Sequence, residues 1–460
     1  MGDKQPNHDA VLAKVNEIVE PELGMPLEIE YVDSASFAEK SKLKMASGEK
    51  FDLIWAGYAN DYHTAVSLGG IMDITDYLDN IKMSDGTVVK MSDAVEQYYL
   101  DAAKVDGRIY GIPNIQINSN PLSFVIRKSV AEECEIDTEG LQMAAQTISD
   151  ATSLRAYLDK LTKEFEKAKK KRPDLFTFNP SYSIPQRFIY EEIVGAVGIK
   201  KSGSSSEVVS ILESDEYKLG VDAIRDWYEK GYIRSDIASK GYTLPNTEEE
   251  KQFVFVPTTW KPGQEIADTK HFGEDVVYSW IESPYVARTN PLATMLTVGE
   301  NSEHAEAAVK FIYMMNSNKA LYNLLCWGIE GENYTKNADG TVTEIPDSGY
   351  NETGSNAWRY GNQFNSFVEE GQPVTVWDDM RDLNNSAQKS QAMGFVPNTD
   401  SIVTELANIT NVRAEYKAKI EFGTAPREEY WDEFIQKLKV AGIDKVRDEI
   451  QKQYDEFLAK

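Results

Sequence analysis

The chain has 460 residues, a length that favours two or three folded units over a single domain. It carries 75 acidic and 48 basic side chains, a formal net charge of −27, which disfavours nucleic acid and anionic lipid as partners because they would be repelled at long range. No run approaches the roughly 18 consecutive apolar residues that a membrane-spanning helix needs, so the sequence as given predicts no crossing of a membrane.

The first hundred residues alternate helical and strand patterns. Residues 8–19 carry apolar side chains at helical spacing, and residues 26–33 alternate apolar and polar side chains as a strand does. Residues 34–49 predict a second amphipathic helix, and residues 51–57 predict a buried parallel strand that ends at a glycine. This alternation predicts an α/β unit, in which a ligand crevice lies beyond the carboxyl ends of the strands.

Two extended tracts interrupted by prolines, at residues 107–127 and 281–297, predict crossings between lobes. Asp-Gly pairs at residues 85–86 and 339–340 stand between β-forming side chains and predict hairpins. The last 35 residues predict two amphipathic helices that are separated at Gly442. The predicted organisation is therefore α/β throughout, with a helical end.

The sequence offers little support for catalysis or metal binding. The four histidines have no metal-ligand spacing, and Cys134 and Cys326 form no CxxC pair, so a disulfide between them is an open alternative. Neither a nucleophile elbow, nor a phosphate-binding loop, nor a dinucleotide fingerprint is present. We therefore expect no cofactor, no metal and no enzymatic activity.

Paired carboxylates leave one enzymatic alternative open. Glu330 with Glu332, and Asp378 with Asp379, could supply the two acids of a glycoside hydrolase or lyase. We favour a role as hydroxyl acceptors or as solvated surface charge, because a chain with 75 acids offers many such pairs.

Aromatic residues are the most informative class. There are eight tryptophans and 24 tyrosines, and several follow predicted strands or stand in turns. A sugar ring has apolar C–H faces and a belt of hydroxyls, so its binding site needs flat rings beside amides and charged groups. Residues 356–365, NAWRYGNQFN, have this mixture, and TTWKPG at 258–263 places Trp260 in similar company. The pattern favours a carbohydrate-binding site.

The tract GRIYGIP at 107–113, followed by LSFVIRKSVAEE at 122–133, resembles the hinge strand and following segment of the family 1 extracellular solute-binding proteins of ABC sugar transporters. Residues 305–335 are similar to a second signature of that family. Residues 387–402 and 434–457 resemble the C-terminal region of a lipoprotein subgroup from Firmicutes. The resemblance extends over nearly the whole chain.

This resemblance implies an α/β, bilobal periplasmic-binding-protein-like fold, with a hinge between two lobes and the ligand in the cleft between them. The N-terminal lobe would comprise residues 1–116 and 285–334, and the C-terminal lobe residues 117–284 and 335–460 with a helical extension. The implied function is capture of an oligosaccharide for delivery to a permease. A receptor for another solute, such as a peptide or polyamine, is the alternative on the same scaffold.

The resemblance also implies a set of ligand contacts. They follow predicted strands, the first hinge and the helix after the second crossing, and their shared character is aromatic, amide or charged. The expected ligand-binding residues are Gly57, Tyr58, Asn60, Asp61, Asn118, Trp260, Lys261, Trp327, Glu330, Trp358, Arg359 and Gln363.

Family members are exported, and those of Gram-positive bacteria are usually tethered by a lipidated cysteine that follows the signal peptide. The sequence given shows neither the signal nor that cysteine, and it starts at the first predicted helix, where the family has a preceding strand. We expect a monomeric cell-surface lipoprotein of a Gram-positive bacterium. Its expected partners are a carbohydrate and the permease subunits, and its contact with the membrane would be limited to the lipid anchor.

Overall fold

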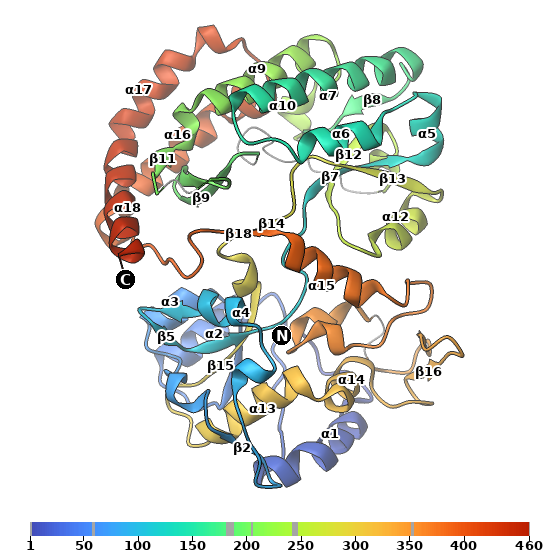
Figure 1. Cartoon of the computed structure of the whole chain (residues 1–460), viewed down its shortest axis with the longest axis vertical. Helices are drawn as coiled ribbons and strands as arrows, with labels where there is room; N and C mark the ends of the chain where they lie inside the picture. The colour runs from blue at the N-terminus through green and yellow to red at the C-terminus, as the bar shows by residue number, and fades with distance from the viewer. Residues whose placement is uncertain are drawn as a thin grey trace. The chain divides into compact units, whose positions relative to one another are not determined.

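The computed structural model describes residues 2–57, 60–180, 188–203, 206–241, 247–350 and 354–459. The chain folds into two compact units, and each unit is built from separate stretches of sequence, as the mixed colours within each unit show (Figure 1). Unit 1 comprises Met1–Asn118, Val286–Asn385 and Met393–Val396; unit 2 comprises Ser119–Tyr285, Ser386–Ala392 and Pro397–Lys460.

The main sheet of unit 1 has three strands in the order β1-β15-β6. β15 (Thr294–Val298) lies in the middle and runs antiparallel to both β1 (Leu53–Gly57) and β6 (Gly111–Pro113). The carboxyl ends of β1 and β6 therefore lie at one edge, beside the first residue of β15. We call this the carboxyl edge of unit 1. The strand predicted at 51–57 is confirmed, but its neighbour is antiparallel, not parallel.

Helices α1 (His8–Leu23), α13 (Ala305–Ser317) and α14 (Lys319–Trp327) form the main apolar cluster of unit 1. The predicted helical face of α1 is confirmed, since Val11, Val15 and Val19 are all buried in this cluster. They repeat every four residues, so they share one face of the helix.

The strand predicted at residues 26–33 is wrong. These residues have no regular secondary structure and pair with no strand of the described chain. Instead, the backbone of Leu27 is held by Asn16 of α1, which accepts its N–H at 2.7 Å and donates to its carbonyl at 3.1 Å. Apolar alternation suits a half-buried segment, but a ladder also requires an adjacent strand with free backbone groups.

The main sheet of unit 2 has four strands in the order β13-β7-β12-β8: Val276–Trp280, Leu122–Arg127, Phe253–Thr259 and Phe176–Phe178. β7 is antiparallel to β12 and to β13, so the carboxyl ends of these two strands lie at one edge, beside the start of β7. We call this the carboxyl edge of unit 2.

The core of unit 2 is aromatic. Helices α7 (Ala151–Lys171) and α9 (Asp215–Glu229) pack against each other, and α7 also contacts β8. Phe165 of α7 stands at the centre, with its ring centroid 4.8–6.2 Å from those of its neighbours. These neighbours are Phe124, Phe178, Trp227, Tyr232 and Phe255.

The C-terminal helices pack on the same unit. α16 (Val403–Glu421) contacts α9, while α18 (Ile443–Leu458) contacts β10 and β11 of a second sheet, ordered β11-β10-β9 (Val209–Ser210, Val197–Lys200, Tyr190–Val194). The predicted break between α17 (Trp431–Ala441) and α18 is confirmed at Gly442, whose φ is 96°. A glycine adopts this left-handed conformation without the steric penalty of a Cβ atom.

Both predicted hairpins are confirmed. The first joins β2 (Ile81–Lys82) to β3 (Val88–Val89), and the second joins β16 (Tyr334–Lys336) to β17 (Val342–Glu344).

Residues 335–385 were expected in the C-terminal lobe, but they belong to unit 1. The reason lies in buried polar contacts with α14: the side chain of Asn323 donates to the Asn365 carbonyl at 2.8 Å and accepts the Phe367 N–H at 2.8 Å. No local sequence pattern encodes contacts across more than 40 residues.

The remaining elements that matter for the site are α2 (Phe37–Ala46), α3 (Tyr62–Ser67), α12 (Gln264–Phe272), α15 (Val376–Ser386) and the short helices η4 (Asn290–Ala293), η5 (Gly354–Arg359) and η6 (Gln363–Asn365).

Val446→Ala tests how far packing of the C-terminal helices stabilises unit 2. Val446 is fully buried, so its truncation should lower the free energy of unfolding by about 2 kcal/mol through lost burial and a residual cavity. Val440→Ala is the matched control, because Val440 on α17 is 79% exposed. Chemical denaturation of the ligand-free protein measures both; equal losses would contradict this packing.

Candidate functional site

The turn after β1 begins the polar surface at the carboxyl edge of unit 1. Gly57 and Asn60 exchange backbone hydrogen bonds of 2.9 and 3.1 Å, and Asn60 is buried, with its side-chain nitrogen partnered by no described residue. Gly57 has φ 150°, and a Cβ there would lie 2.2 Å from the Ala293 carbonyl oxygen. Asp61 caps α3 by accepting the Thr64 N–H at 2.8 Å. Tyr58, the other predicted residue of this turn, lies outside the described residues.

Helix α3 brings a histidine that the sequence analysis did not select. Both ring nitrogens of His63 are shielded from solvent and have no hydrogen-bond partner in the described chain. Burial, the largest effect, lowers the pKa of His63; Asp61 opposes this shift and Arg288 adds to it. A histidine with a pKa below its ordinary value is neutral at neutral pH, so it offers one donor and one acceptor.

Trp358 is fixed to the same edge through its backbone. Its carbonyl accepts hydrogen bonds from the Thr294 hydroxyl at 3.2 Å and the Asn114 amide at 3.4 Å. Thr294 is the residue paired with Gly57 in the sheet, and its hydroxyl also accepts from Gln116 at 2.9 Å. The Thr294 hydroxyl and the Asn114 amide therefore tie η5 to the carboxyl edge.

Arg359 and Gln363 complete this group. The Arg359 guanidinium lies 5.1 Å from the centroid of the Trp358 ring, a cation–π distance. Gln363 is buried, its N–H donates to the Ile115 carbonyl at 2.8 Å, and its side-chain oxygen has no partner among the described residues. The structure thus brings five predicted site residues to one edge of unit 1: Gly57, Asn60, Trp358, Arg359 and Gln363.

Asn118 stabilises the backbone at the end of the first stretch of unit 1. Its N–H donates to Asn384 at 2.8 Å, its carbonyl accepts from Asn290 at 2.7 Å, and its side chain donates to the Tyr98 hydroxyl at 3.4 Å. These bonds give the buried Asn118 a structural role.

Two predicted contacts have other roles in the structure. Trp327 is only 2% exposed; it lies in the apolar cluster of unit 1 and donates to the Ser366 hydroxyl at 2.9 Å. We therefore reassign it to the core, where its indole N–H is satisfied. Glu330 is exposed and ion-paired with Lys336 at 2.6 Å beside the β16–β17 hairpin.

Unit 2 presents a pair of tryptophans at its own carboxyl edge. Trp260 follows β12 and Trp280 ends β13, and their ring centroids are 5.3 Å apart at an interplanar angle of 46°. Both tryptophans are partly exposed. The backbone N–H of Trp260 donates to the Pro121 carbonyl at 3.0 Å. The prediction omitted Trp280, although its position at the end of a strand was the signal that could have identified it.

The paired carboxylates are surface residues. Asp378 forms an ion pair with Arg381 at 2.7 Å, and Asp379 accepts from the Thr375 hydroxyl at 2.8 Å. Glu332, like Glu330, is exposed. In the described part of the chain, neither pair has the buried, solvent-excluded setting that tunes two acids for catalysis.

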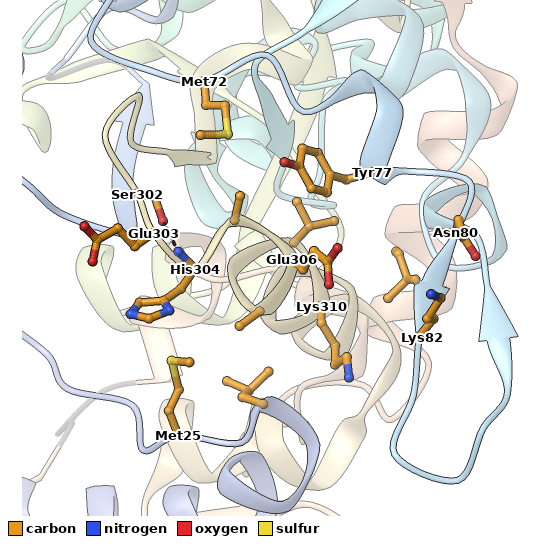
Figure 2. A pocket seen from close by; sticks show the side chains of 15 residues that line it. Met25, Met72, Tyr77, Asn80, Lys82, Ser302, Glu303, His304, Glu306 and Lys310 are labelled. Atoms are coloured by element: carbon orange, nitrogen blue, oxygen red, sulfur yellow. Dashed lines mark hydrogen bonds between the residues drawn. The ribbon is translucent and has the colours of Figure 1, made fainter.

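A cavity of about 540 Å³ in unit 1 lies apart from the carboxyl edge. Its lining includes Ser302 and His304, which follow the other end of β15, and Figure 2 shows Met72 and Tyr77 on one side with Met25 on the other. None of the predicted site residues lines it. Across the described residues, no group of three or more His, Cys, Asp or Glu could hold a metal ion, and no helix is long and apolar enough to cross a membrane.

Most of the chain matches one known protein family. Residues 16–327 match the family described as bacterial extracellular solute-binding protein. The chain belongs to this family. Residues 391–459 of this solute-binding protein also match a domain of unknown function, DUF3502, which spans the three C-terminal helices. The predicted family is confirmed.

Proteins that are similar to this chain over its whole length are named as binding proteins for a substrate or solute. A carbohydrate ABC transporter substrate-binding protein of Streptococcus pneumoniae is 25% identical over 472 residues, covering 100% of this chain and 90% of its own. The crystal structure of an N-glycan transport solute binding protein (NgtS) of the same species has a TM-score of 0.78 at 24% identity, covering 100% of this chain and 98% of that one. NgtS in complex with Man5GlcNAc gives 0.63 at 24% identity, covering 100% and 97%. The predicted α/β solute-binding-protein fold is confirmed, and the names of these relatives describe them as binding proteins.

Gly57→Ala tests the close approach at the carboxyl edge of unit 1. A methyl group would collide with the Ala293 carbonyl, and the positive φ of Gly57 is unfavourable for alanine. The free energy of unfolding should therefore fall by more than ~1 kcal/mol. Gly86→Ala is the control: Gly86 also has a positive φ, 87°, but open space around it, and should cost about 1 kcal/mol. Equal losses in denaturation experiments would show that the approach of η4 is not tight.

Proposed function

We propose that this solute-binding protein captures an oligosaccharide outside the cell and delivers it, unchanged, to the permease of an ABC importer. The observation that carries the proposal is the chemistry at the two carboxyl edges. Unit 1 presents Trp358 with the amides of Asn60 and Gln363, and unit 2 presents the Trp260–Trp280 pair. Flat rings beside amide groups match the apolar faces and hydroxyls of sugar rings.

The names of similar proteins support a carbohydrate. The Streptococcus pneumoniae relative is named for carbohydrate transport, and the solved NgtS structures include complexes with Man1GlcNAc and Man5GlcNAc. Separate aromatic surfaces in the two units favour several sugar subsites, hence an oligosaccharide over a monosaccharide.

Export and tethering belong to the same proposal. The family description supports an extracellular location, and we infer that a lipidated cysteine attaches the protein to the surface of a Gram-positive bacterium. The net charge of −27 supports a monomer that does not self-associate, because copies would repel one another. The partners are then the sugar and the permease subunits.

Trp358→Ala tests the stacking surface in unit 1. Loss of the ring should weaken oligosaccharide binding about fivefold or more, since an aromatic contact contributes on the order of 1 kcal/mol or more. Trp358→Phe keeps a stacking face and should retain most of the affinity. Calorimetric titration with Man5GlcNAc and with fructo-oligosaccharides measures both; unchanged affinity in the alanine variant would exclude the ring from binding.

Glu330→Gln separates binding from hydrolysis. Because Glu330 is exposed and paired with Lys336, we expect unchanged affinity and no cleavage by either protein. Chromatography of each oligosaccharide after prolonged incubation detects products. Cleavage by the wild type that the variant abolishes would instead support a glycoside hydrolase.

A further inference from the structure

Lys261 stands at the carboxyl edge of unit 2, directly after Trp260, whose ring pairs with Trp280. It is half-buried, in the turn between β12 and α12, and its carbonyl accepts the Gln264 N–H at 3.0 Å. No carboxylate of the described chain forms an ion pair with its ammonium group.

The Asp268 carboxylate does not neutralise the Lys261 ammonium group. The Asp268 carboxylate accepts hydrogen bonds from the Tyr278 hydroxyl at 2.7 Å and from Gln264 at 3.0 Å, so its oxygens are already engaged. Burial, the larger effect, lowers the pKa of Lys261, and the more distant charge of Asp268 only partly opposes it. A desolvated cation without a contacting anion destabilises the ligand-free state.

A ligand could relieve this cost in proportion to its charge. A sugar hydroxyl accepts a hydrogen bond from an ammonium group but leaves the charge uncompensated, whereas a carboxylate or sulfate forms a shorter and stronger charge-assisted bond. The adjacent tryptophan pair supplies a face for the ring that carries the acidic group.

We propose that Lys261 is a specificity-determining residue that selects an oligosaccharide with an acidic group, a carboxylate or a sulfate ester, on one of its sugars. This inference rests on the proposed function and names the substrate class of the same site. The acidic group ion-pairs with the Lys261 ammonium while its sugar ring stacks on Trp260 or Trp280.

The test compares matched glycans on the intact wild-type chain: a sialylated oligosaccharide, the same oligosaccharide after removal of sialic acid, and its sulfated counterpart. Calorimetric titration should give at least tenfold tighter binding for one acidic form than for the neutral form. The form that binds more tightly identifies the acid as carboxylate or sulfate. If both acidic forms bind no more tightly than the neutral form, the inference is overturned. Binding of the neutral form would still support the proposed function.

Variants locate the preference. Lys261→Met should lower the affinity for the acidic form at least tenfold and bring it close to the affinity for the neutral form, and a thermal unfolding midpoint near that of the wild type shows that the variant folds. Lys261→Arg should retain the preference, and Lys270→Met, at an exposed position on α12, should behave as the wild type. A preference that survives in Lys261→Met overturns the assignment. If the wild type binds no glycan, neutral or acidic, the proposed function fails as well.

Discussion

The central, antiparallel position of β15 is the constraint on which the surface of unit 1 depends. Its first residue, Thr294, pairs with Gly57 in β1, and its carbonyl accepts the Asn114 N–H just beyond β6 at 2.9 Å. Because β15 runs against both neighbours, two strand ends that are more than 50 residues apart in sequence meet at the same edge. The Thr294 hydroxyl then attaches η5, and with it Trp358, to that edge.

In unit 2, strand ends that are distant in sequence also meet at one edge of the sheet. There β7 is the strand that runs against both neighbours, and the carboxyl ends of β12 and β13 meet beside its first residues. The consequence is the close Trp260–Trp280 pair, two rings that are 20 positions apart along the chain. In both units, the side chains proposed to contact a sugar lie at strand ends or on segments that hydrogen bonds attach to those ends, so they are positioned before any ligand arrives.

The sequence could predict what is encoded locally. The valine repeat of α1, the Asp-Gly hairpins and the glycine between α17 and α18 follow from backbone and packing rules that act within a few residues. Strand pairing is not local. For this reason the sequence pattern wrongly predicts a parallel neighbour for β1 and a place in a sheet for residues 26–33. Trp327 shows the same limit for the site: the family resemblance implied a ligand contact there, but the fold buries its ring beside Ser366.

Charge acts on two scales in this protein. The net charge of −27 repels anions at a distance, but at physiological ionic strength this effect is screened beyond about 8 Å. The groups at the two edges are different in kind: neutral amides, aromatic faces, the Arg359 guanidinium, a buried histidine that is neutral at neutral pH, and a partly desolvated lysine. An acidic sugar would gain its attraction only on contact, so selectivity for it would lie in slow dissociation more than in fast association.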